Sequence, residues 1–171
     1  LSSSSAASDV YKRQAVGSIL GSAFRGTTYP YLSSNLDFSA NDDLSPLVRP
    51  GGAAPQSNSI TSSTVITRGG EKIGVIGATT PGLAFITSTD GVTARPVVSA
   101  QDLSAAEIDA LAVEIQREVD AVVAANPGLN KVVLTSHLQI LDIETSLAQK
   151  LRNVDIIMAG GSEARLVDSN D

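Results

Sequence analysis

The sequence predicts an α/β fold, in which helices pack on a sheet that contains parallel strands. Two amphipathic helices, over residues 104–125 and 142–152, are each followed directly by a short apolar strand, at 131–136 and 154–158. Helices and strands that alternate at these lengths are typical of parallel strands joined by right-handed crossovers. The 171 residues suffice for one domain with a buried core, and no internal repeat divides them.

Composition and charge exclude several classes of protein. Hydrophobic residues make up 42% and charged residues 18% of the chain, as in a globular protein. The net charge of −6 argues against nucleic acid as a partner, because phosphate backbones are bound by clustered Lys and Arg. Without cysteine there is no disulfide, thiol nucleophile or cysteine-ligated zinc. No stretch approaches the ~20 apolar residues of a transmembrane segment, and no signal peptide is visible.

The N-terminal part begins with a segment that has no apolar face, residues 1–14 (LSSSSAASDVYKRQ). We interpret it as a non-native, adapter-derived leader or a natural disordered one that makes no packing contact with the core. Residues 29–38 are expected to form a short strand, and 39–58, rich in Pro, Gly, Ser and Asn, a loop. The β-branched runs 64–68 and 72–77 flank a Gly-Gly-Glu connector and predict a hairpin whose second strand is buried on both faces.

The clearest element is the helix over 104–125. Ser104 and Glu107 have the spacing of a capping box, in which hydroxyl and carboxylate satisfy free N–H groups at the helix start. Asp142 is expected to cap the second helix, and residues 154–158 are expected to form a buried strand. Apolar residues that recur every three or four positions predict one apolar face of the first helix. This face is formed by Ile108, Leu111, Ala112, Ile115, Val119 and Val122.

Open α/β sheets bind their ligands at the carboxyl ends of strands, and two such ends carry distinctive residues. His137, the only histidine, directly follows one strand, and Gly160-Gly161 follow the next. Neighbouring parallel strands lie ~5 Å apart, so both ends are expected to face one ligand. From the residues alone, a hydrogen bond at a strand end explains His137 equally well, and a tight turn explains the glycine pair better. No P-loop spacing and no Ser-His-Asp triad is present.

Four segments resemble, in order, the catalytic domain of bacterial 5′-nucleotidases within the calcineurin-like metallophosphoesterases. They are YPYLSSNLDF (29–38), EKIGVIGATTP (71–81), VVLTSH (132–137) and VDIIMAGGSEARL (154–166). The resemblance implies that residues 15–171 are part of a metallophosphoesterase-type αββα sandwich that is incomplete at both ends. It further implies N-terminal metal motifs and a C-terminal substrate domain outside this piece, and a periplasmic or extracellular location.

The resemblance also implies a two-metal centre of divalent ions such as zinc, manganese or calcium, with His137 as a ligand. Histidines of the family also follow the strand of the fourth segment, where this chain has Gly161 and Glu163. Gly161 has no side chain with which to ligate a metal. Glu163 is therefore the second candidate ligand, since a carboxylate suits all three ions. No further catalytic or cofactor-binding residue is assigned.

The implied activity is two-metal hydrolysis of a phosphate monoester, by a 5′-nucleotidase that acts on a nucleotide or another small phosphate ester. With two ligands, residues 1–171 are expected to be inactive alone. One alternative is a nucleotide-sugar or cyclic-nucleotide hydrolase of the same superfamily. The other is a binding or structural module that has lost its metal site, because Gly161 stands where histidine is expected. No oligomeric state follows from the sequence.

Overall fold

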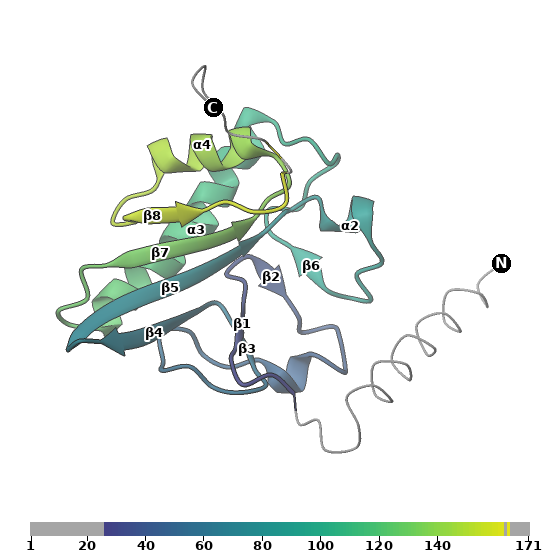
Figure 1. The fold of residues 1–171 in the computed structure, drawn as a ribbon. Coiled ribbons are helices and arrows are strands. Elements are labelled where there is room, and N and C mark those ends of the chain that lie inside the picture. Colours follow the sequence, from purple (N-terminus) through teal and green to yellow (C-terminus); the bar gives the residue numbers. More distant parts are fainter. Residues whose placement is uncertain (1–25, 163, 165–171) are drawn as a thin grey trace.

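The structure is a computed structural model that describes residues 26–162 and residue 164 (Figure 1). The leader 1–14 and Glu163, for which the sequence made specific predictions, lie outside the described residues. The architecture is mixed α/β, as predicted. None of the described helices is long and apolar enough to cross a bilayer.

The central sheet has four strands in the order β4-β5-β7-β8. Their bounds are β4 Ser63–Arg68, β5 Glu71–Thr79, β7 Val132–His137 and β8 Ile156–Met158. β4 and β5 form the predicted antiparallel hairpin, and β5, β7 and β8 run parallel, as the alternation of helices and strands predicts. The carboxyl ends of the three parallel strands therefore lie at one edge of the sheet (Figure 1).

The remaining elements are short and lie on the β4–β5 side of this sheet (Figure 1). Two further sheets pair β1 Tyr31–Leu32 with β3 Ile60–Thr61, and β2 Leu36–Asp37 with β6 Thr93–Ala94. The segment 29–38 thus holds two short strands where one was predicted, because each part pairs with a different and distant segment. A 3-10 helix, Ser45–Leu47, interrupts the loop 39–58, and the short helix α2, Leu83–Ile86, follows β5.

Helices α3 (Ala105–Ala125) and α4 (Leu141–Lys150) pack against each other on one face of the sheet (Figure 1). The apolar face predicted for α3 is buried there, except that Ile108 is only half-buried. One cluster of buried side chains joins both helices to the sheet. Its least exposed members are Ile76, Leu111, Ile115, Val119, Val122, Val132, Leu134, Leu138 and Leu147.

The two helices start differently. In α3 the predicted capping box is present: the Glu107 N–H donates to Ser104 Oγ (3.4 Å) and the Ser104 N–H to Glu107 Oε2 (2.8 Å). The hydroxyl and N–H of Ser104 lower the pKa of Glu107, so this stabilisation is lost as the pH falls through the lowered pKa. The prediction that Asp142 caps α4 is wrong. The N-cap is Ile140, and Asp142 lies in the first turn, where its charge favours the helix dipole.

Replacement of the α3 cap tests this local stabilisation. Ser104→Ala removes the acceptor of the Glu107 N–H and is expected to lower the free energy of unfolding by about 1 kcal/mol in urea denaturation. Ser146→Ala is the matched control, because the Ser146 hydroxyl only bonds the carbonyl of Asp142 inside α4. Equal losses in both variants would contradict the capping role.

The face of the sheet opposite the helices is only partly covered. On this face Val75 and Val133 are half-buried, and Ile156 and Met158 are 55% and 59% exposed. The predictions of buried strands are therefore wrong for β8 and for the first half of β5, whereas residues 76–78 of β5 are buried on both faces. They fail because both crossover helices, α3 and α4, lie on the same side of the sheet, so only alternate residues of each strand are buried by them.

Candidate functional site

The ends of β7 and β8 meet at the edge of the sheet. His137 is the last residue of β7, and Gly160 and Gly161 follow β8. A Cβ atom placed on Gly161 would lie 2.9 Å from His137 Nε2, and one on Gly160 would lie 3.7 Å from His137 Nδ1. The imidazole therefore lies directly against the glycine pair. The backbone at Gly161 has a φ of +89°, which glycine adopts without strain.

The imidazole of His137 is accessible in the described part of the chain. The residue is exposed, and its ring forms no hydrogen bond within the described part of the chain. Its backbone is held from the neighbouring strand: Thr79 of β5 is its register partner, and the Thr80 N–H donates to the His137 carbonyl at 3.0 Å. A fixed backbone with an unpartnered ring is an arrangement suited to a metal ligand or a proton carrier.

A buried asparagine, Asn35, supports the end of β5. It lies between β1 and β2 and is 1% exposed. Its Nδ2 donates to the Thr79 carbonyl (2.7 Å) and to the Arg95 carbonyl (3.1 Å), and its Oδ1 accepts from the Thr79 N–H (2.8 Å). The amide thus joins three segments next to His137. No sequence pattern indicated this role, although Asn35 lies within the segment 29–38 that carries part of the family resemblance.

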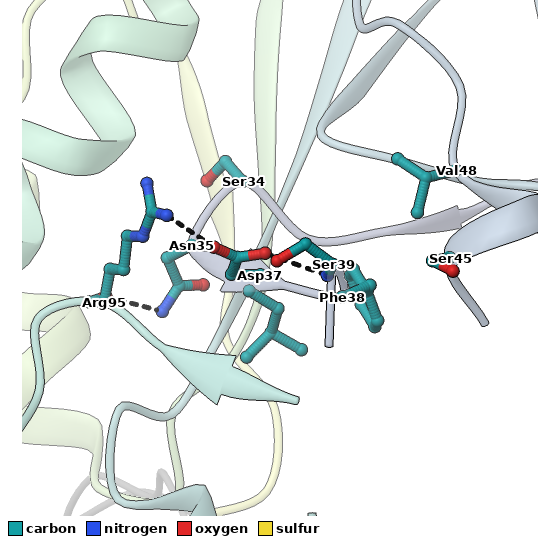
Figure 2. A pocket seen from close by; sticks show the side chains of 9 residues that line it. Ser34, Asn35, Asp37, Phe38, Ser39, Ser45, Val48 and Arg95 are labelled. Atoms are coloured by element: carbon teal, nitrogen blue, oxygen red, sulfur yellow. Dashed lines mark hydrogen bonds and ion pairs between the residues drawn. The ribbon is translucent and has the colours of Figure 1, made fainter. Parts of the chain in front are cut away.

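A hollow of about 560 Å³ opens beside Asn35 (Figure 2). Its wall includes Phe38, Val48 and the ion pair of Arg95 with Asp37, whose Nη2 and Oδ2 atoms are 2.6 Å apart. The N–H of Ser39 and, more weakly, the Arg95 guanidinium lower the pKa of Asp37. Because these two charges neutralise each other, the described lining residues offer no free cation to a phosphate group.

Beneath the strand ends, on the helix face, lies a buried carboxylate. Glu144 of α4 is 3% exposed, and its Oε1 accepts from Ser136 Oγ at 3.2 Å.

Ser136 and His137 point to opposite faces of β7, because successive strand residues alternate. A Ser136–His137 catalytic pair is therefore excluded, in agreement with the absence of a triad motif in the sequence.

The metal ligands proposed from the sequence can be compared with this geometry in part. His137 offers an accessible imidazole nitrogen of the kind that zinc and manganese accept, whereas Glu163 lies outside the described residues. Within the described residues, no group of three or more His, Asp or Glu side chains is arranged to hold a metal. A catalytic zinc site needs three protein ligands, so His137 fits as one ligand of a site that requires more.

No protein-family model and no curated protein matches the chain. Among solved structures, a 5′-nucleotidase precursor from Thermus thermophilus is 27% identical, with a TM-score of 0.55 over 77% of this chain and 20% of its own. The NAD nucleotidase of Haemophilus influenzae is 21% identical, with a TM-score of 0.54 over 82% of this chain and 23% of its own. The chain spans about a fifth of the length of these proteins. The resemblance to 5′-nucleotidases and the predicted fold class are confirmed.

Proposed function

We propose that this chain is part of a metal-dependent hydrolase of phosphoric monoesters, a 5′-nucleotidase that releases phosphate from nucleotides outside the cytoplasm. One observation carries the proposal: a histidine that is accessible and has no partner among the described residues ends the central parallel strand of a fold similar to that of a 5′-nucleotidase precursor. Ligands of open α/β sheets bind at this edge. The net charge of −6 agrees with metal ions that neutralise the phosphate.

In this proposal His137 is one metal ligand and Glu163 is the second. The His137 ring binds through a nitrogen that no described side chain occupies, while the bond from Thr80 to the His137 carbonyl holds the backbone. Two divalent ions, of zinc, manganese or calcium, would supply Lewis-acid catalysis and lower the pKa of bound water. The remaining ligands would come from residues other than those described.

A non-catalytic binding or structural module is the second candidate function. It is favoured by Gly161, where the nucleotidase pattern has histidine and where the His137 ring lies against the backbone, 2.9 Å from the position of a Cβ atom. A nucleotide-sugar or cyclic-nucleotide hydrolase would use the same metal centre and differ in its substrate domain. Metal binding at His137 separates both hydrolases from the module.

The single histidine makes the metal proposal directly testable, because only one imidazole contributes ring signals to an NMR spectrum of the chain. We expect Zn²⁺ to shift the His137 ring signals progressively and Mn²⁺ to broaden them, with EDTA restoring both. Binding should be weak, since two ligands lack the chelate geometry of three. In the Glu163→Ala variant the shift should require more Zn²⁺. Ring signals that do not change at millimolar Zn²⁺ would favour the module.

A further inference from the structure

The outer edge of β5 changes partner near its carboxyl end. β4 pairs with β5 only as far as Ser63 and Ile76, and β5 continues to Thr79. At Gly77 the N–H donates to the Ser62 carbonyl, and the carbonyl accepts from the Ser34 N–H. At Thr79 both backbone groups are bonded by the side chain of Asn35. The Asn35 amide therefore takes the place of a strand at the last residue of β5.

Every hydrogen-bonding group of this amide is used. Nδ2 donates twice, to the carbonyls of Thr79 and Arg95, and Oδ1 accepts from the Thr79 N–H and from Ser33 Oγ (3.3 Å). Figure 2 shows the Asn35 side chain against the backbone of Arg95. A side chain that is 1% exposed and fully bonded has one orientation available, so it fixes the backbone that it contacts.

The backbone that Asn35 fixes is the part of β5 that pairs with His137. Thr79 pairs with His137 across the β5–β7 ladder, and the next N–H, that of Thr80, donates to the His137 carbonyl. Without Asn35, the end of β5 would lose its two outer hydrogen bonds. His137 would keep its pairing within the β5–β7 ladder, but the strand end that holds it would be less firmly fixed.

We infer that Asn35 is a positioning residue of the candidate site, which acts through the backbone of Thr79 and Thr80 to hold His137 in place for a ligand. This inference rests on the proposed metal-binding role of His137. The consequence is that loss of the Asn35 amide weakens metal binding at His137, although Asn35 itself contacts no metal.

The test compares three variants of the chain. Asn35→Ala removes all four hydrogen bonds, and the isosteric Asn35→Asp removes the two donated ones and is the variant of choice if the alanine variant does not fold. Asn41→Ala is the matched control: Asn41 is also buried (6% exposed) and also bonds backbone groups, those of Asp90 and Leu44, but it has no bond to β5. The two readouts are the His137 ring signals without metal and the Zn²⁺ concentration that half-saturates their shift.

We expect both Asn35 variants to move the metal-free ring signals and to weaken Zn²⁺ binding about 10-fold or more, as is usual when the support of a metal ligand is removed. Asn41→Ala should leave both readouts within about twofold of the original chain, even if it is equally destabilised. Unchanged readouts in the Asn35 variants, or equal changes in Asn41→Ala, would overturn the inference. If the original chain binds no Zn²⁺, the metal proposal fails, while the metal-free ring signals still decide whether Asn35 positions His137.

Discussion

Gly77→Ala is expected to destabilise the protein by about 3 kcal/mol or more, at the upper end of the cost of overpacking. A Cβ atom on Gly77 would overlap the backbone carbonyl group of Leu32 in β1. Backbone atoms yield less easily than a side chain, and β1 is held by its pairing with β3 and by the bond from Ser34 to Gly77. Since a domain has only about 5–15 kcal/mol of stability, this loss would remove roughly a fifth to more than half of it.

A second glycine of the same strand gives the control. A Cβ atom on Gly74 would meet only side-chain atoms, the nearest being Leu129 Cδ2 at 3.2 Å, and that side chain is able to shift. Gly74→Ala is therefore expected to change the free energy of unfolding by less than about 1 kcal/mol. Urea denaturation followed by circular dichroism measures both variants. Similar losses at the two positions would show that β1 does not approach β5 as closely as described.

The second large effect concerns the complete enzyme that we propose. There, His137→Ala should lower the turnover of a nucleotide by more than about 100-fold, because removal of a supporting residue alone costs about 10–100-fold and this variant removes a ligand itself. The loss should be accompanied by a lower bound-metal content in elemental analysis. Full turnover and full metal content after His137→Ala would contradict the ligand role and with it the proposed function.

Glu163→Ala in the same enzyme tests the second ligand separately. We expect both metal content and turnover to fall, whereas retention of both would make Glu163 an ordinary surface carboxylate. Asp109→Asn in α3 is a suitable control, because Asp109 is an exposed carboxylate that pairs with Lys150 of α4, on the helix layer. Residues 1–171 alone are expected to show no metal-dependent hydrolysis of AMP, and hydrolysis would contradict the view that the site needs further ligands.

The elements that were predicted well depend on contacts close in the chain. The capping box of Ser104 and Glu107 and the 3.6-residue period located α3 almost to the residue, and the Gly-Gly-Glu connector located the β4–β5 hairpin. The start of α4 was predicted wrongly, because Asp142 has the residue type of a helix cap but α4 begins before it. The apolar character of β8 did not reveal that one of its faces is open.

Sequence patterns alone were enough to establish the α/β class, the parallel order of β7 and β8, and His137 and the glycine pair as candidate site residues. The folded chain was needed to learn which side of the sheet is covered and that the His137 ring lies against Gly161. It was also needed to learn that the Asn35 side chain bonds the backbone of Thr79 at the edge of β5, although the two residues are 44 positions apart in the chain. Periodicity and capping report neighbours within a few residues, whereas a buried amide is specified by backbone groups that only folding brings to it.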